Sequence, residues 1–555
     1  MRPIRYRARL VSVLALWIAA SSAGAQGHGA AVPAGRQPPP LFDNLGSHHR
    51  AITTGSPSVQ AYFDQGLRWL MAFNMDEAQR SFAEAAARDP ECAMCFWGVG
   101  MALSPHYNLP GLADRTAAGA RAVAHGIGVA GDKPEVERDL LAALTARLAD
   151  PAPASMEGFL ELDRAYADRM RALAAKYPAD LDIQAFYAES LMNLRPWRLW
   201  EKDGSAAPGT NEILALLEAV LAKNPEHPGA NHLFIHALEA SPFPERAAGA
   251  AERVARTIPG SAHIVHMPGH IWSRMGRWEE AAEVNRKAIA VDREYVARSP
   301  EALNGFYSMY YAHNYQFLWW AALMEGRYEE ALANGRAVVV GMPIEMMREF
   351  PGFDFLLGYP IWTHVRFERH EAALAEPAPP QGFLYATGVW RAARGLALVG
   401  LGKPAAARAE LAEVERLHAA LPADAMAAFN SAALLLGLAR DWLAGEIAVA
   451  EGDLDSGIAR LTAAVTAEDQ QVDDDPPDWY FPSRPSLGRA LLRAGRPAEA
   501  VEVFRADLRK FPENGWSLAG LADSYEAAGN AQAASAARSR LEAAWRHADV
   551  PSPGH

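Results

Sequence analysis

Two pairs of histidines stand 34 residues apart in this chain of 555 residues. The first pair is His232 and His236, and the second is His266 and His270. Within each pair the spacing is four residues, which places both imidazoles on one face of a helix. Imidazole nitrogens contributed by two neighbouring helices are ligands that zinc, copper and iron bind well. The spacing therefore indicates a transition-metal centre.

Three further residues extend these helical faces. Glu239 follows His236 by about one turn, His263 precedes His266 by about one turn, and His313 takes the position of His263 on the next expected helix. Six histidines are more than one tetrahedral ion requires, so a centre with two ions is an alternative. The sequence predicts ligands for Cu, Zn or Fe among His232, His236, Glu239, His263, His266, His270 and His313.

The same residues leave the chemistry of the centre open. A zinc protease of the HExxH type has Glu directly after its first histidine, and Leu233 stands there in this chain. Glu189 aligns with His236 one repeat earlier and is the candidate general base of a metal-dependent hydrolase. Copper or iron would instead favour an oxidase. Two alternatives need no metal. The groove is then a polar ligand pocket of a metal-free protein-interaction scaffold, or the histidines are only packing residues bonded to carbonyl groups.

These helices must come from a repeated unit, because one sequence phrase recurs along the chain. Gly276-Arg-Trp-Glu-Glu-Ala281 is followed by Gly326-Arg-Tyr-Glu-Glu-Ala331, and shorter copies begin at Gly402, Gly452, Gly495 and Gly529. An earlier copy places aromatic and small residues in the same order, at Tyr62, Gly66, Trp69, Ala78, Phe82, Ala85 and Pro90. This recurring phrase, together with the 34-residue spacing of the histidine pairs, indicates stacked helical hairpins.

This phrase resembles the tetratricopeptide repeat superfamily over most of the chain after residue 50. The resemblance implies an all-α superhelical solenoid of helical hairpins, whose first helices line a concave groove for a peptide, protein or small-molecule ligand. In that register the predicted metal ligands, Gln316 and Trp320 face the groove. Asn193 and Arg195 precede an enlarged loop and form a candidate lid over the end of the groove.

Several phrases are also similar to those of a narrower group, the exported bacterial tetratricopeptide proteins with a histidine-rich central region. They cover residues 91–98, 232–242, 266–271 and 514–518. This resemblance implies architecture and export and gives no chemistry.

The N-terminus predicts export to the periplasm or the medium. Residues 1–25 form a signal peptide, with four arginines before a short apolar stretch and a small-residue cleavage site. Residues 26–50 are rich in Gly, Pro and Ala and are expected to form a flexible leader. The repeats then divide at the Pro-rich stretch 376–381 into an N-terminal solenoid with the histidine groove, 51–375, and C-terminal repeats, 382–550.

Charge and cysteine content narrow the partners further. The formal net charge is −13, which argues against a nucleic-acid partner. No apolar run after the signal peptide is long enough to span a membrane. The only cysteines, Cys92 and Cys95, form a CxxC that suits a disulfide in an exported chain, with a thiolate metal site as the alternative. The predicted function is an exported solenoid that binds a ligand beside a metal centre.

Overall fold

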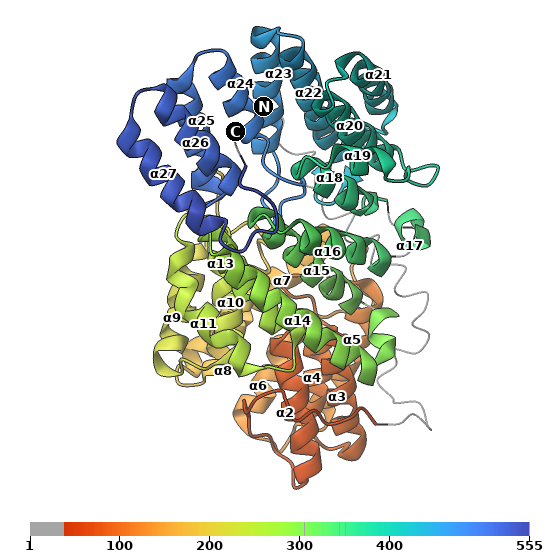
Figure 1. The fold of residues 1–555 in the computed structure, drawn as a ribbon. Coiled ribbons are helices and arrows are strands. Elements are labelled where there is room, and N and C mark those ends of the chain that lie inside the picture. The colour runs from red at the N-terminus through yellow and green to blue at the C-terminus, as the bar shows by residue number, and fades with distance from the viewer. Residues whose placement is uncertain (1–37, 305, 343, 350, 554–555) are drawn as a thin grey trace. The chain divides into compact units, whose positions relative to one another are not determined.

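The computed structural model describes residues 38–553, with the exceptions of residues 305, 343 and 350. The predicted signal peptide and the first part of the predicted leader, up to residue 37, lie outside the described residues. The described residues form two compact units. We call residues 38–271 and 286–311 the N-terminal unit, and residues 272–285 and 312–553 the C-terminal unit. Both are built almost entirely of helices, as Figure 1 shows.

The N-terminal unit begins with twelve helical segments. They are α2 (Pro57–Met71), α3 (Met75–Arg88), α4 (Ala93–Leu103), α5 (Ala113–Gly128), α6 (Glu135–Leu144), α7 (Met156–Lys176), α8 (Leu181–Met192), α9 (Thr210–Lys223), α10 (Pro228–Leu238), η1 (Pro244–Ala247), α11 (Ala248–Thr257) and α12 (Ala262–His266). The 3-10 helix η2 (Pro300–Asn304) also belongs to this unit. Three helices include residues of both units, namely α13 (Pro268–Arg274), α14 (Trp278–Arg298) and α15 (Tyr307–Met324).

The C-terminal unit continues with α16 (Tyr328–Gly341), α17 (Ile344–Glu349), η3 (Asp354–Gly358), α18 (Tyr359–Arg366), α19 (His370–Ala375), α20 (Leu384–Gly400), α21 (Pro404–Ala420), α22 (Ala432–Ala450), α23 (Leu454–Asp469), α24 (Arg484–Arg493), α25 (Pro497–Lys510), α26 (Gly515–Ala527) and α27 (Ala531–Ala544). Two short strands, β1 (Met426–Ala427) and β2 (Asn430–Ser431), pair antiparallel before α22. The predicted all-α solenoid is confirmed, apart from this small hairpin.

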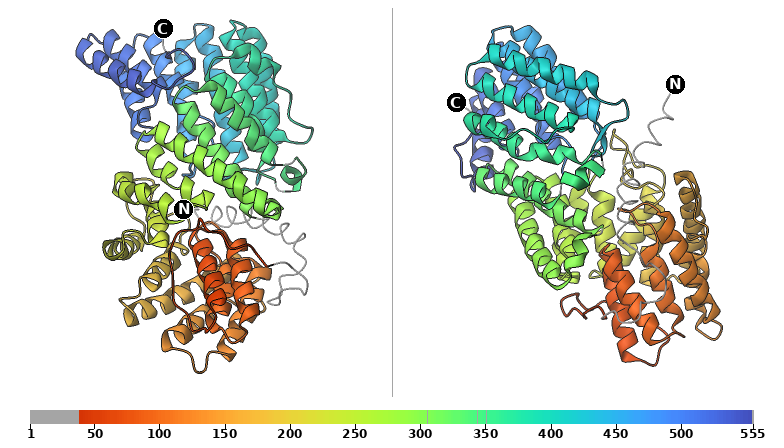
Figure 2. Two further views of the ribbon diagram at one scale, coloured as in Figure 1. Left: turned by 60° about the horizontal axis from the view of Figure 1, so that its bottom comes forward. Right: turned by 90° about the vertical axis from the view of Figure 1, so that its right-hand side faces the viewer.

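Consecutive helices pack against each other in pairs within each unit. Such pairs include α2 with α3, α4 with α5, α20 with α21, α22 with α23 and α26 with α27. Figures 1 and 2 show them as antiparallel helical hairpins. In the N-terminal unit α10 also contacts α2, which lies far earlier in the sequence. This contact brings the histidines of α10 to the C-terminal end of α2.

The turns between paired helices explain why the recurring glycines are needed. All six glycines that begin the recurring phrases have a positive φ, at Gly276, Gly326, Gly402, Gly452, Gly495 and Gly529. In each turn the N–H of the next residue bonds to the carbonyl five residues before it, as from Arg277 to Trp272 and from Arg327 to Ala322. This is the Schellman ending of a helix, which requires a left-handed residue before the donor. Glycine takes that conformation without a steric cost.

Phe73 takes the glycine's place in the turn after α2. Its φ is 57°, and the N–H of Asn74 bonds to the carbonyl of Trp69 at 3.0 Å, as in the other turns. A residue with a side chain costs about 1–2 kcal/mol in this conformation. A bulky residue at a strained position is often kept for what its side chain contacts.

Small residues allow the helices of a hairpin to approach an aromatic ring closely. A Cβ added at Gly66 or Gly98 would lie 2.7 Å or 2.3 Å from the ring of Phe82. The C-terminal unit repeats this arrangement, with Gly488 and Gly520 on either side of Phe504. In both cases the glycines lie 16 residues before and after the phenylalanine. The same sequence spacing therefore produces the same packing of two glycines on one ring.

The last part of the predicted leader differs from the flexible segment that the sequence predicts. Residues 38–50 have no helix, but the backbone N–H of Phe42 bonds to Gln65 at 2.8 Å, and Asn44 accepts a bond from Gly260 N–H at 2.7 Å. A Cβ added at Gly46 would lie 2.0 Å from the carbonyl oxygen of Thr257. These contacts hold the segment against α2 and the loop before α12. Composition alone had not indicated them.

The Pro-rich stretch 376–381 lies inside the C-terminal unit, between α19 and α20. Its first residue, Glu376, accepts hydrogen bonds from Arg336 and His364. The boundaries between the two compact units lie instead at residues 271/272, 285/286 and 311/312.

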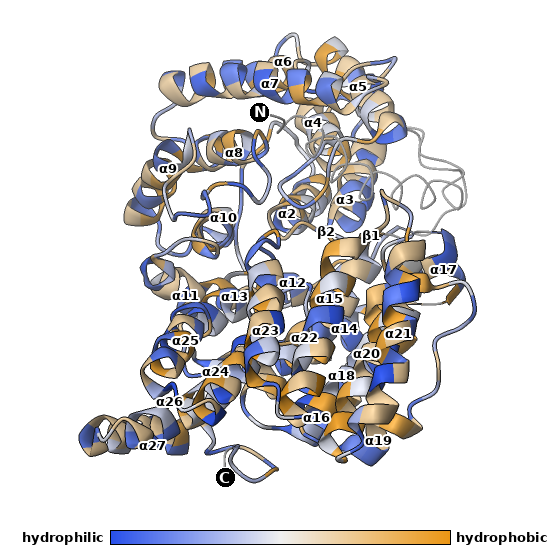
Figure 3. Cartoon of the chain, turned by 90° about the horizontal axis from the view of Figure 1, so that it is seen from above, coloured by the Kyte–Doolittle hydropathy of each residue, from blue (hydrophilic) through white to orange (hydrophobic). Residues whose placement is uncertain are grey.

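Figure 3 shows that polar and apolar residues alternate along the helices. None of the described helices is long and apolar enough to cross a membrane.

Substitution of Gly98 by alanine tests the close packing on Phe82. The added methyl group meets the aromatic ring, so we expect Gly98→Ala to lower the free energy of unfolding by about 1–3 kcal/mol. Gly128→Ala is the control, because nothing lies within 4 Å of a Cβ at that position. Urea denaturation followed by circular dichroism measures both. Equal stability of the two variants would contradict the packing argument.

Candidate metal centre

Helix α10 carries the first histidine pair in a fully buried position. It begins at Pro228, and the side chain of His227 caps it by accepting the N–H of Ala230. Every residue of α10 is buried, including His232, which is 0% exposed, and His236. A helix with two buried imidazoles on one face is unusual unless these polar groups have partners.

The second pair lies across a break that the sequence prediction of one continuous helix had not included. Helix α12 ends at His266, and α13 begins at Pro268. Proline has no N–H to bond to the carbonyl four residues before it, so the hydrogen-bond ladder is interrupted there. Met267 nevertheless keeps helical angles, with φ −49° and ψ −37°. His266 and His270 therefore still face each other, with their Nε2 atoms 3.0 Å apart.

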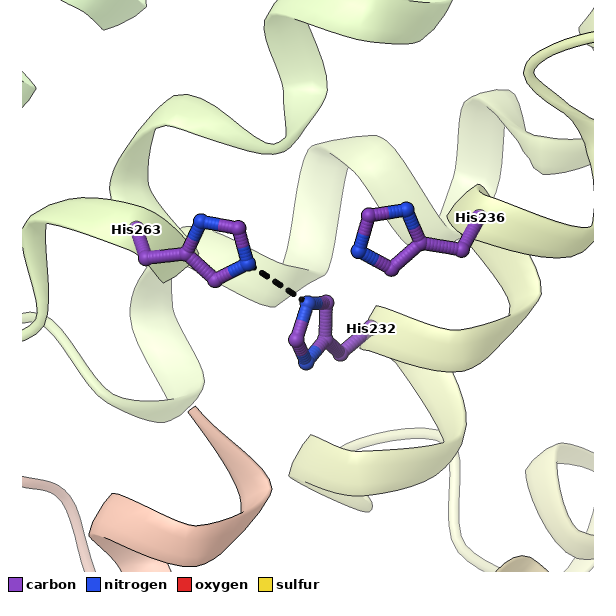
Figure 4. Close-up of side chains that lie close together, drawn as sticks. All are labelled: His232, His236 and His263. Atoms are coloured by element: carbon purple, nitrogen blue, oxygen red, sulfur yellow. Dashed lines mark hydrogen bonds between the residues drawn. The ribbon is translucent and has the colours of Figure 1, made fainter. Parts of the chain in front are cut away.

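Three histidines of the N-terminal unit converge on one point. The Nε2 atoms of His232 and His263 lie 3.0 Å apart, and His236 turns its own ring toward them, as Figure 4 shows. The three imidazoles each offer one nitrogen, and these nitrogens all lie within 4.8 Å of one another. We call His232, His236 and His263 the histidine trio.

Hydrogen bonds at Nδ1 determine where two members of the trio hold a lone pair. Nδ1 of His232 lies 2.7 Å from the carbonyl oxygen of Met71, which can only accept, so this nitrogen carries the proton. Nδ1 of His236 donates in the same way to Glu239 Oε1 at 3.0 Å. In a neutral imidazole the other nitrogen then has a lone pair. Both Nε2 atoms therefore have the form that binds a metal.

Burial supports this neutral form. It lowers the pKa of His232 well below its ordinary value, and the neighbouring His236 lowers it further, while the bond to Met71 opposes the shift only in part. The buried Nε2 of His236 makes no hydrogen bond to any of the described residues. A buried polar atom without a partner costs about 1–3 kcal/mol, so such an atom suggests a missing ligand.

Glu239 contacts the imidazoles on the side away from the point of convergence. Its Oε1 binds Nδ1 of His236, and its Oε2 lies 3.1 Å from Nδ1 of His270. His236 and His270 are equivalent positions of successive repeats, so one carboxylate serves both. A carboxylate on Nδ1 orients the ring and strengthens Nε2 as a ligand, as is usual around protein metals.

The trio has nearly the spacing that a tetrahedral ion requires. Zinc–nitrogen bonds of about 2.0–2.1 Å place two ligand nitrogens roughly 3.3 Å apart. The His232–His263 distance of 3.0 Å is close to this, and rotation of the His236 ring would close the remaining gap. The donor set is therefore suitable for a transition metal with three imidazole ligands.

An aromatic wall, made of Phe73, Tyr107 and Tyr310, encloses the trio. The ring of Phe73 lies 4.4 Å from His232, Tyr107 lies 5.3 Å from His236, and Tyr310 lies 4.2 Å from His263. The strained turn after α2 is what directs the ring of Phe73 to this place. Sequence analysis missed Phe73 and Tyr107 because they lie far from the histidines in the chain. The one sequence feature that could have indicated Phe73 is that a phenylalanine stands where the other turns have glycine.

His106 is a fourth buried imidazole beside the wall, and the sequence analysis also missed it. Its ring lies 4.3 Å from Phe73, and its Nδ1 accepts the N–H of Asn108. Burial lowers the pKa of His106 well below its ordinary value, and the positive charges of Arg115 and Arg147 add to the effect. The neutral ring therefore carries its proton on Nε2, which has no acceptor among the described residues.

Glu189, the candidate general base, is buried on α8 in different surroundings. Burial raises its pKa, and the positive charge of Arg147 and the amide of Asn193 oppose the shift. Arg147 itself is buried and donates to Asp163 at 3.1 Å. Asn193 ends α8 as a buried residue, and Arg195 follows it in partial exposure. These interactions connect Glu189 with the segment between α6 and α7 and with α7 itself.

His313, Gln316 and Trp320 lie on α15 in the C-terminal unit. Nδ1 of His313 lies 3.4 Å from Gln316 Oε1. Trp320 is buried and packs edge-on against Trp278 and Phe511. Trp320 therefore packs within the core of the C-terminal unit.

A separate histidine cluster, also missed, lies in the N-terminal unit. His48 and His227 both bond through Nε2 to Oδ1 of Asp182, at 2.9 and 3.2 Å, and Arg50 bonds to Oδ2 at 3.1 Å. Burial alone would raise the pKa of Asp182, but these bonds outweigh it and hold the pKa well below its ordinary value. The cluster fastens the segment before α2 to α8.

The two cysteines pair with each other. Cys92 and Cys95 form a disulfide at the start of α4, and both are fully buried. The described cysteines therefore have no thiolate to offer a metal.

Comparisons with known proteins concern the fold alone. No protein-family model matches the sequence, and no curated protein matches it significantly. Solved structures similar to this chain include Cut9 in the APC/C Cut9–Hcn1 hetero-tetramer, with 14% identity and a TM-score of 0.29 over 88% of this chain and 74% of that one. Human IFIT1 with PPP-AAAA matches at 13% identity with a TM-score of 0.34, over 88% of this chain and 91% of that one. Yeast Tom70 matches at 10% identity with a TM-score of 0.30, over 88% of this chain and 91% of that one.

These three are tetratricopeptide repeat proteins. At such TM-scores the matches carry no argument about detail, partner or activity. The architecture follows instead from the chain's own paired helices and from its six glycine turns. The described residues form an all-α protein of paired helical hairpins, with buried histidine clusters in its N-terminal unit.

Proposed function

We propose that the protein is an exported binding scaffold whose N-terminal unit holds a transition-metal ion through Nε2 of His232, His236 and His263. The observation that carries the proposal is the direction of the lone pairs. Met71 and Glu239 accept from Nδ1 of two histidines and so leave Nε2 of each available at the point of convergence. Zinc, copper or iron suits this donor set.

Export is supported by the N-terminal sequence and by the cysteine pair. Positive residues, an apolar stretch and a small-residue cleavage site follow the order of a signal peptide. The Cys92–Cys95 disulfide suits an oxidising compartment such as the periplasm or the medium. The ligand proposed for the repeats is a peptide, a protein or a small molecule.

A metal-free network is the competing proposal, and one distance favours it. The 3.0 Å between Nε2 of His232 and Nε2 of His263 also suits an N–H···N hydrogen bond, with His263 as the donor. Such a network would leave Nε2 of His236 buried without a partner, which the metal proposal explains and the network does not.

The first test is the metal content of the mature protein. We expect about one equivalent of a single transition metal in protein purified without a histidine tag, because three converging imidazole nitrogens bind such an ion tightly. The double variant His232→Ala/His263→Ala should lose it. Elemental mass spectrometry measures both proteins, and circular dichroism verifies that the variant is folded.

A matched control separates the trio from buried histidines in general. His364 is 3% exposed and its two ring nitrogens already contact Tyr328 and Glu376, so His364→Gln should keep the metal. If the natural protein contains no metal and takes up none on titration with zinc or copper, the metal-free network is the correct description.

Glu239 and Glu189 give opposite expectations for the affinity of the metal. Glu239→Gln removes the carboxylate that orients His236, so we expect the affinity for zinc to fall about tenfold to a hundredfold. Glu189→Gln changes an equally buried glutamate that interacts with Arg147, so the affinity should stay the same. Competition with a chelating dye measures both. An unchanged affinity in Glu239→Gln would remove Glu239 from the centre.

A further inference from the structure

The connection between α23 and α24 carries a run of buried aromatic residues, although it contains neither helix nor strand. We call residues 478–483, the last part of this connection, the aromatic segment. All of its residues are buried. Connections between helices usually lie on the surface, because their backbone groups need hydrogen-bond partners. The burial of the aromatic segment therefore depends on specific contacts with the rest of the C-terminal unit.

The aromatic segment covers two tryptophans of the helices beneath it. The ring of Tyr480 stacks on Trp362 of α18, with centroids 5.1 Å apart, and Trp479 meets the same ring at 4.8 Å. Phe481 lies edge-on to Trp442 of α22, at 5.4 Å. These contacts make the segment an occupant of the faces of α18 and α22.

Tyr480 also closes over η3 and its first residue, Asp354. The Tyr480 hydroxyl donates to the carbonyl oxygen of Phe355 at 2.8 Å, and a Cβ added at Gly358 would lie 2.0 Å from that hydroxyl. The charge of Asp354 acts on Tyr480. Withdrawal of Tyr480 from this place would therefore let water reach the Asp354 carboxyl.

Two carboxyl groups are buried with the aromatic segment and have only neutral partners. Asp478 accepts from the Asn430 amide at 2.7 Å and from the N–H of Phe429 at 3.0 Å. Asp354 accepts from the N–H of Ala386 at 3.1 Å. Asp478 is 2% exposed and Asp354 is 7% exposed, and neither makes an ion pair with any of the described residues.

The other titratable groups around these carboxyls bring no positive charge. They are one further acid and three tyrosines, namely Asp474, Tyr359, Tyr385 and Tyr480. Arg274 approaches the same connection from α13, but it is paired with Asp473 and Asp475, at 3.0 and 3.1 Å. Ionisation of either carboxyl would thus bury a negative charge without a cation, which is costly.

The pKa values follow from this environment. Burial raises the pKa of Asp354 to about 6, and burial also raises the pKa of Asp478. An exposed aspartate has a pKa of about 4, so the protonated carboxyls stabilise the closed contact. This stabilisation is fully present below about pH 4 and is lost as the pH rises through about 6.

We infer that the aromatic segment is a pH-sensitive plug, which covers α18 and α22 while Asp354 and Asp478 are protonated and opens more often once they ionise. Opening lets water reach both carboxyls and uncovers Trp362 and Trp442. The inference does not depend on the proposed metal centre, because every residue in it belongs to the C-terminal unit.

Hydrogen–deuterium exchange, corrected for the effect of pH on the chemical exchange rate, measures how often the segment opens. We expect the protection of the amides of residues 478–481 to fall by about tenfold or more between about pH 5 and pH 7.5, because each pKa unit changes the opening equilibrium tenfold. Asp354→Asn/Asp478→Asn should show the same protection at both pH values, since an amide keeps the oxygen acceptor but does not ionise.

Asp441→Asn is the matched control. Asp441 is also buried, but it is paired with Arg440 and Arg460 at 2.7 and 2.9 Å, so the fall in protection should persist in this variant. Circular dichroism verifies that each variant is folded, and Asp354→Asn alone, with a smaller fall, replaces the double variant if that does not fold.

Two outcomes in the unaltered protein overturn the inference. Protection of the segment that stays constant between the two pH values shows that the carboxyls do not control its opening. An equal loss of protection in α25 shows that the whole unit unfolds and that the segment does not open by itself. A fall in protection that persists in the folded double variant would assign the pH dependence to other groups.

Discussion

The hydrogen bond from His232 Nδ1 to the carbonyl oxygen of Met71 determines what the centre of the N-terminal unit can do. A carbonyl oxygen has no proton to give, so it fixes the proton of the imidazole on Nδ1 and turns the lone pair of Nε2 inward. Glu239 does the same for His236. The bond also requires that the end of α2 lie against α10. Its two residues, Met71 and His232, are 161 positions apart in the sequence. The protonation of His232 on Nδ1 therefore depends on the packing of α10 against α2.

The repeat architecture explains why one carboxylate can serve two helices. His236 and His270 are 34 residues apart and occupy equivalent positions of successive repeats. Stacking of the repeats brings these positions together, and Glu239 lies between them with one oxygen toward each. A solenoid creates such neighbours wherever a residue type recurs at its period. The period is thus a means of assembling ligands that does not depend on any single turn or loop.

Sequence reasoning succeeded where this period applies and failed where the chain folds back on itself. The six glycine turns and the juxtaposition of the histidine pairs follow from the repeat, because contacts between neighbouring repeats are local. Phe73, His106 and Tyr107 reach the trio from more than a hundred residues away, and no local pattern announces that contact. For Glu189 the predicted role as a general base stays a prediction. Its register places it with the histidines, and the structure adds the neighbouring positive charge of Arg147.

The two buried histidine clusters of the N-terminal unit show why proximity alone does not identify a metal site. His227 and His48 meet Asp182 as closely as the trio's members meet each other. However, Nδ1 of His227 accepts the N–H of Ala230, so its proton must be on Nε2, the atom that faces Asp182. A protonated nitrogen cannot bind a metal. At His232 and His236 the partner of Nδ1 is an acceptor, whereas at His227 it is a donor. The polarity of that one hydrogen bond decides which nitrogen has the lone pair, and therefore whether buried histidines can hold an ion or can only fasten a segment of chain.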